Sequence, residues 1–207
     1  MTSETGTGSP PSSRTATAIV LAFYAGLAVL TQAASALLGV QPLHTWQWRP
    51  AHAGVGAVAA LPLVLLFVLL MRWEWAPLVR VRRFLVEQLR PLLAGRSLGE
   101  LALIAGLAGL TEEMLFRGLL QEGLAAWLGS AGGLLAAGLL FGASHWITPA
   151  YVLVAGLMGL YLGCLYQATG NLLAPVLAHA AYDFAALTLL LRTGVTVRPP
   201  SPGPGPR

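Results

Sequence analysis

The feature that most constrains the fold is a run of 60 residues without Asp, Glu, Lys or Arg, between Glu122 and Asp183. Soluble domains carry about 25% charged residues, whereas this chain carries 10% and has a mean hydropathy of +0.71. A membrane-spanning helix needs about 20 apolar residues, so the run accommodates two to three crossings. The sequence therefore predicts a polytopic membrane protein.

Apolar stretches alternate with short polar connectors along the chain. We expect spans at about residues 16–40 and 53–71, a third starting near Leu98, and three more at about 131–147, 150–168 and 171–192. The connector 72–97 alternates arginines with apolar residues and tryptophans, a pattern typical of a helix lying in the membrane interface. The predicted fold is all-α, a polytopic membrane helix bundle of about six transmembrane helices plus one interfacial amphipathic helix.

Composition divides the chain into four segments. Residues 1–16 and 193–207 are rich in Pro, Gly, Ser or Thr and are predicted to be disordered tails. Residues 17–97 hold two spans and the basic connector, and 98–192 form a compact bundle. Small residues four apart allow helices to approach closely there; the pairs are Ala102/Gly106, Gly138/Gly142, Gly159/Gly163 and Ala174/Ala178.

Three local features bear on processing and partners. Ala34–Ala36 resembles a signal-peptide cleavage site, but the run continues at spanning length, so we expect an uncleaved helix. The connector 72–97 holds six of the twelve arginines; lying between spans, it favours contact with the bilayer rather than with nucleic acid, and a cytoplasmic position for both termini, in a bacterial plasma membrane. Cys164 is expected to be buried, and His44 and His52 to lie in a loop.

Polar groups inside the apolar stretches identify a candidate site. Glu112, Glu113 and Arg117 lie in the third span, where a charge costs at least about 2.5–3.5 kcal/mol. On a helix, Glu113 and Arg117 are four residues apart and can pair, while Glu112 projects about 100° away from Glu113. Taken alone, the cluster is also typical of an interfacial Glu/Arg cluster that ends a helix.

Two histidines on later spans extend this cluster. His145 lies four residues after Phe141 on one helix face, and His179 lies four residues before Asp183. Each pair alone is also expected of a structural hydrogen bond. Two carboxylates and two imidazoles in one bundle, however, are the groups with which a hydrolase activates water.

The order and spacing of these residues resemble the CPBP family, which includes the type II CAAX prenyl proteases and the bacterial Abi proteins of bacteriocin self-immunity. The resemblance covers roughly residues 98–190 and rests on three motifs: Glu112-Glu113-x-x-x-Arg117-Gly118, Phe141-x-x-x-His145 and Asn171-x-x-x-Pro175-x-x-x-His179-x-x-x-Asp183. It implies an intramembrane endopeptidase acting on membrane-anchored or lipid-modified peptides or proteins.

The resemblance also implies a role for each residue. Glu112 and His145 would activate water, Glu113 would position Arg117, and His179 with Asp183 would stabilise the oxyanion. The prenyl proteases usually have Asn where this chain has Asp183, and an ionised Asp cannot donate a hydrogen bond. Either Asp183 is protonated, or it orients His179, which then donates alone.

Metal dependence and two other functions stay open at this point. Glu112, His145 and His179 form a plausible zinc set; without an HExxH motif, we favour Glu112 as a metal-free base. One alternative is a catalytically silent membrane scaffold in bacteriocin immunity or partner maturation. Another is a small proton-coupled transporter, although we see no inverted repeat and the polar groups cluster at one site.

Overall fold

The computed structural model describes residues 13–192, and no strand occurs in that range. The long helices are α1 (Ser13–Leu38), α2 (Pro50–Arg72), α5 (Leu98–Glu113), α6 (Glu122–Ser144), α7 (Pro149–Thr169) and α8 (Leu173–Arg192). Two short helices, α3 (Ala76–Phe84) and α4 (Arg90–Leu93), and two π-helical segments, Leu85–Leu89 and Met114–Gln121, complete the fold. The prediction of an all-α bundle is confirmed.

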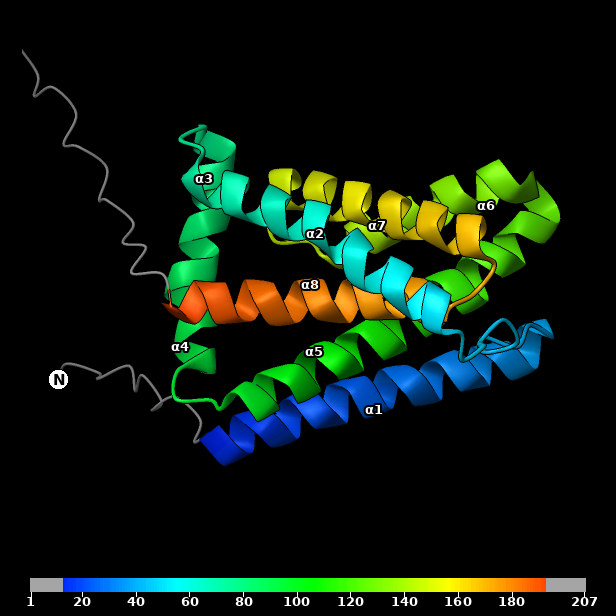
Figure 1. Ribbon diagram of the computed structural model, residues 1–207, viewed down its shortest axis with the longest axis horizontal. Helices are drawn as coiled ribbons and strands as arrows, with labels where there is room; N and C mark the ends of the chain where they lie inside the picture. The colour runs from blue at the N-terminus through cyan, green and yellow to red at the C-terminus, as the bar shows by residue number, and fades with distance from the viewer. Residues whose placement is uncertain (1–12, 193–207) are drawn as a thin grey trace, which may run out of the picture.

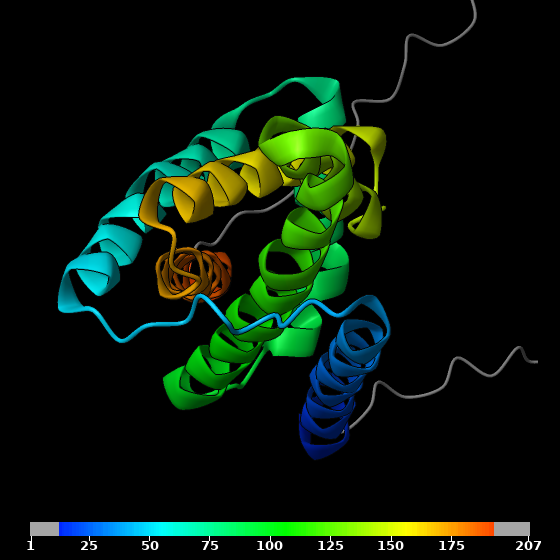
Figure 2. The same ribbon diagram turned by 90° about the vertical axis from the view of Figure 1, so that its right-hand side faces the viewer.

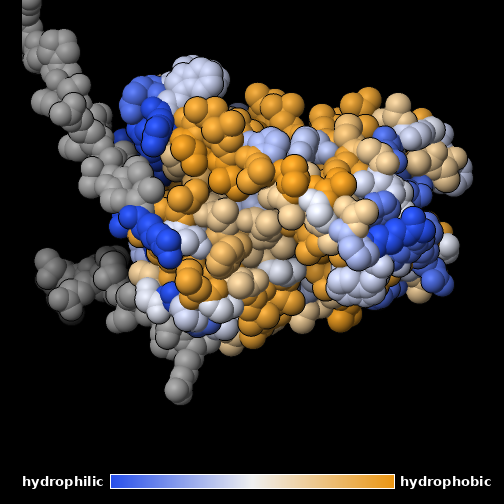
Figure 3. Space-filling view, in the orientation of Figure 1, coloured by the Kyte–Doolittle hydropathy of each residue, from blue (hydrophilic) through white to orange (hydrophobic). Residues whose placement is uncertain are grey.

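The surface has the polarity expected of a membrane protein. Hydrophobic residues cover the middle of the face seen in Figure 3, while hydrophilic residues gather at its two ends. Many large apolar side chains are exposed on the long helices, Leu61 by 64% and Leu139 by 71%. Within residues 13–192, five helices are long and apolar enough to cross a membrane. The chain is an integral membrane protein.

The predicted third and fourth spans form one continuous helical stretch, Leu98–Ser144, of 47 residues. A straight helix of that length would extend about 70 Å, more than twice the hydrocarbon thickness of a bilayer. The chain instead turns back at Gly129, whose φ of 73° and ψ of 167° are non-helical. Glycine adopts this positive φ without strain. The stretch counts as one of the five candidate spans, although the turn at Gly129 divides it into two helices.

Residues 1–12 and 193–207, which include most of the two predicted tails, lie outside the described range. Helix α1 begins at Ser13, within the predicted N-terminal tail.

The core of the bundle comprises α2, α5, α6, α7 and α8. The most extensive contacts join α5 with α8, α6 with α7, and α2 with α8, whereas α1 packs mainly on α5 and the π-helical segment that follows it. Helices α3 and α4 run across one end of the long helices, opposite the α1–α2 connection (Figures 1 and 2). This transverse segment buries Leu78, Val81, Leu85 and Leu93 against the bundle.

Glycines make the closest helix contacts, although not on the face of α5 that we expected. A Cβ on Gly142 would lie 2.7 Å from the carbonyl oxygen of Val152 on α7, and one on Gly109 would lie 2.9 Å from backbone atoms of α8. Gly106 has nothing within 4 Å of such a Cβ, and Ala102 is exposed. The packed pair on α5 is therefore Ala105/Gly109, since the sequence carries the same spacing on two faces.

Two further expectations are wrong. Cys164 is exposed, because an apolar stretch does not distinguish the lipid-facing side of a helix from its interior side. His52 lies in the first turn of α2 rather than in a loop, and its Nδ1 is 3.0 Å from Asn171 Nδ2. His44 lies in a turn, as expected, and its Nδ1 is 2.7 Å from the Gln41 carbonyl oxygen.

Two matched glycine substitutions test the packing of α5. We expect Gly109→Ala to destabilise the protein by about 1–3 kcal/mol, because the added methyl group meets the backbone of α8. Gly106→Ala should be neutral or stabilising, since it adds helix propensity in open space. Thermal unfolding in detergent measures both. Equal effects of the two substitutions would contradict the assigned packing face.

Candidate active site

A buried carboxylate, Glu113, connects two helices at the centre of the bundle. Its Oε1 accepts hydrogen bonds from Arg117 Nη1 at 2.8 Å and from His179 Nδ1 at 2.7 Å. A carboxylate paired with an arginine accepts only, so the His179 ring carries a proton on Nδ1. All three side chains are at most 3% exposed. The carboxylate thereby fixes both the position and the tautomer of His179.

Arg117 extends these contacts to the next two helices. It lies in the π-helical segment Met114–Gln121, a helix form frequent at functional sites. Its Nη2 donates to the carbonyl oxygen of Gly159 on α7 at 2.5 Å, and its guanidinium lies 4.9 Å from the ring centre of Phe141 on α6. A charge buried in this way requires partners on several sides, and the fold supplies them from α5, α6 and α7.

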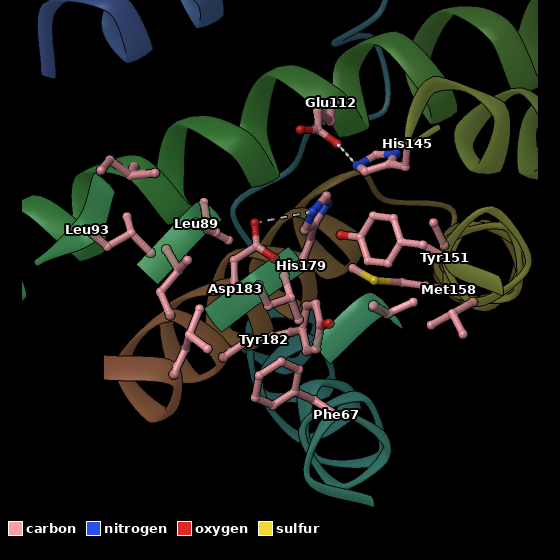
Figure 4. Close-up of a pocket in the computed structure, with 18 of the residues that line it drawn as sticks. Phe67, Leu89, Leu93, Glu112, His145, Tyr151, Met158, His179, Tyr182 and Asp183 are labelled. Carbon is pink, nitrogen blue, oxygen red and sulfur yellow. Dashed lines mark ion pairs between the residues drawn. The ribbon is translucent and has the colours of Figure 1, made fainter. Parts of the chain in front are cut away.

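Glu112 and His145 form a second pair, which faces a cavity. Glu112 Oε2 lies 3.7 Å from His145 Nε2, and this oxygen is buried and accepts no hydrogen bond from the described residues (Figure 4). His145 Nδ1 is 2.8 Å from the carbonyl oxygen of Phe141 and therefore donates to it. In the neutral ring, Nε2 then has a free lone pair directed toward Glu112.

Asp183 lies close to His179 without a hydrogen bond. Its Oδ2 is 3.6 Å from His179 Nε2, beyond hydrogen-bond distance. The spacing of four residues therefore brings the two together, as expected, but the stronger partner of His179 is Glu113. Both Asp183 and the Nε2 side of His179 line the same cavity as Glu112 and His145.

Phe141 orients the two imidazoles. Its ring stacks on His145, with centroids 4.6 Å apart, and meets His179 edge-on at 5.9 Å. Aromatic pairs prefer these geometries. Phe141 and His145 thus lie on the same face of the chain, as predicted, and their rings stack on each other.

The cavity has a volume of about 600 Å³ and is mostly apolar away from these groups. Its walls come from α1, α2, the transverse segment α3–α4, α5, α6, α7 and α8. The volume is in the range of small-molecule and cofactor sites. The four candidate groups Glu112, His145, His179 and Asp183 thus lie together in the wall of a chamber suited to an apolar chain.

Two structural contacts were missing from the sequence prediction. The spacing of four residues predicted Asp183 as the partner of His179. The hydrogen bond between His179 and Glu113 joins residues 66 apart in the sequence, so no local spacing indicated it. Asn171 had no predicted role. Its side chain bonds the backbone of Gln47 and of Leu173 and so attaches the α1–α2 connection to the start of α8.

Comparison with known proteins relates part of the chain to a known family. The family described as "Type II CAAX prenyl endopeptidase Rce1-like" matches residues 94–185. This part of the chain is similar to the Rce1-like family. All six predicted site residues lie within the matched segment, and the resemblance noted from the motifs is confirmed. A protease family with these buried polar groups supports a hydrolase role at the level of the family.

One curated relative and the solved structures complete the comparison. The relative is an uncharacterized protein of Bacillus subtilis (strain 168), YpbD, 35% identical over 100 residues. The aligned part makes up 45% of this chain and 47% of YpbD, so the chain spans about half the length of this relative. No solved structure matches significantly.

The adjacent glutamates should differ in their effect on stability. Glu113→Ala leaves Arg117 buried without its carboxylate, and breaking such a pair costs about 3–5 kcal/mol. Glu112→Ala removes a carboxylate that has no hydrogen bond on its buried oxygen, so we expect little loss of stability or a gain. Thermal unfolding of both variants in detergent tests this. A larger loss for Glu112→Ala would contradict the assigned roles.

Proposed function

We propose that this protein is an intramembrane endopeptidase that hydrolyses membrane-anchored or lipid-modified peptides. The observation that supports this most directly is the pair Glu112–His145 at a cavity wall, 3.7 Å apart, with an unpartnered carboxylate oxygen. Buried polar atoms without a partner are rare and call for an explanation. A water molecule that becomes the nucleophile supplies one.

The first step activates water. A water held by the Glu112 carboxylate and His145 Nε2 gives a proton to Glu112 as its oxygen attacks the peptide carbonyl carbon. A carbon–oxygen bond forms, and the π electron pair of the carbonyl moves onto its oxygen. His145 is suited to hold the water because its Nδ1 is occupied by the Phe141 carbonyl and only Nε2 faces the cavity.

The second step stabilises the oxyanion and releases the amine. His179 has a carboxylate on each side, Glu113 at Nδ1 and Asp183 near Nε2. In this step its ring carries a proton on both nitrogens. Its Nε2–H then donates to the negatively charged oxygen. As the carbonyl re-forms, the carbon–nitrogen bond breaks and the amine leaves with the proton held by Glu112. In this scheme Asp183 supports His179 and does not itself donate.

The cavity also favours a class of substrate. Its apolar walls include residues of the transverse segment, such as Leu85 and Leu89, and of α1, such as Phe23. An apolar chain attached to a peptide would bury its surface there at about 25 cal/mol per Å². A lipid-modified peptide end, a prenylated one included, fits a chamber with apolar walls and hydrolytic groups on one side.

We propose that the reaction proceeds without a bound metal ion. Within residues 13–192, no group of three His, Cys, Asp or Glu side chains is arranged to hold one. Glu112, His145 and His179 therefore do not fit a preformed zinc site. The steps above use only the groups of this chain.

Cleavage of a library of lipidated and membrane-anchored peptides tests the proposed function. We expect the purified wild type to cleave at least one member, and Glu112→Gln and His145→Ala to lose at least about 100-fold in rate, as is usual for an acid–base group. A chelator should have no effect. Loss of activity on chelation with recovery on adding zinc would instead support a metalloprotease. Wild-type rates in both variants would favour the scaffold hypothesis.

We also propose that the protein lies in a bacterial plasma membrane with the transverse segment in the cytoplasm, because six arginines lie between residues 72 and 97. Arg49 immediately precedes α2, Gln88 lies in the transverse segment, and both are exposed. The α1–α2 connection and the transverse segment lie at opposite ends of the bundle (Figure 1). In a Cys164→Ala background, Arg49→Cys should react with an impermeant maleimide in intact cells, and Gln88→Cys only after lysis. The reverse pattern would contradict this orientation.

A further inference from the structure

The proposed oxyanion site has one donor where two are usual. His179 Nε2 can donate, whereas an ionised Asp183 can only accept. Oxyanion sites generally combine several donors aimed at the developing charge, and the loss of one typically slows catalysis by about 10²–10³. A second donor on the same cavity wall would complete the site.

Tyr151 lies at that position. The chain turns sharply after His145, and Thr148 caps α7 by accepting a hydrogen bond from the backbone nitrogen of Tyr151 at 3.1 Å, with Pro149 as the first helical residue. Both features fix the start of the helix. The Tyr151 ring then lies against His145, with centroids 6.2 Å apart.

The hydroxyl of Tyr151 has no hydrogen-bond partner among residues 13–192, although the side chain lines the cavity between α7 and α8. In Figure 4 it points from α7 toward the ring of His179. Because the hydroxyl is not enclosed by protein, it is free to donate to a substrate bound in the cavity.

Resting on the proposed function, we infer that the Tyr151 hydroxyl is a second hydrogen-bond donor to the oxyanion of the substrate. The Tyr151 hydroxyl would supply the second donor that an ionised Asp183 cannot supply. The hydrogen bond involves no proton transfer, so the reaction steps are unchanged. Two other tyrosines of the cavity are placed differently: Tyr182 has its ring against Phe67, and Tyr24 lies on α1.

The test compares a charged mimic of the intermediate with the uncleaved substrate. The probes are an S-farnesylated peptide amide and the same peptide with a phosphonate at the scissile carbonyl. Both are bound to Glu112→Gln protein, which prevents turnover, with and without Tyr151→Phe. We expect Tyr151→Phe to weaken phosphonate binding 10- to 100-fold and to leave amide binding unchanged. In an otherwise wild-type protein it should lower kcat by about 100-fold with little change in KM.

The control is Tyr161→Phe on the same helix. It removes a hydroxyl that donates to the Ala59 carbonyl and does not line the cavity, so neither affinity should change. Equal weakening of both probes by Tyr151→Phe, or of neither, would overturn the inference, as would a phosphonate that does not bind at all. If phosphonate binding depends on Tyr151 but the wild type cleaves none of the peptides, the donor stands and the protease proposal fails.

Discussion

The structure depends on one carboxylate shared by an arginine and a histidine in an apolar bundle. Glu113 Oε1 receives hydrogen bonds from Arg117 and His179, and all three side chains are almost completely buried. In a low-dielectric interior these interactions are strong, but each group would be costly to bury alone. The helices that contribute them are therefore held in one relative position, and the fold and the candidate site cannot be separated energetically.

This constraint fixes the atoms that face the cavity. His179 directs Nε2 away from Glu113, and His145 directs Nε2 away from the Phe141 carbonyl. Phe141 contacts both rings and the guanidinium of Arg117, so a shift of α6 would move both imidazoles. Local tautomers and packing thus set the direction of each reactive nitrogen, as preorganised sites require.

The sequence predicted the features that depend on local periodicity. The helical class, the Glu113–Arg117 pair and the proximity of His179 to Asp183 all follow from spacings of four residues. It did not predict features that depend on which helices meet. The Glu113–His179 bond, the packing face at Gly109 rather than Gly106, and the exposure of Cys164 each depend on contacts between helices distant in sequence. Gly129 lies just before the span predicted at about residues 131–147, but the sequence analysis did not predict its positive φ.

The polar groups of the bundle divide into two kinds according to their partners. Glu113, Arg117 and Asn171 are bonded to other parts of the protein and connect helices. Glu112 Oε2, His145 Nε2 and the Tyr151 hydroxyl have no hydrogen bond within the described range, and their side chains line one cavity. A buried polar atom without a partner costs about 1–3 kcal/mol, and both Glu112 Oε2 and Glu113 Oε2 are such atoms. The other oxygen of Glu113 is held by Arg117 and His179, whereas Glu112 forms no hydrogen bond within the described range. The convergence of Glu112, His145 and Tyr151 on one chamber is what a site for a reacting molecule requires.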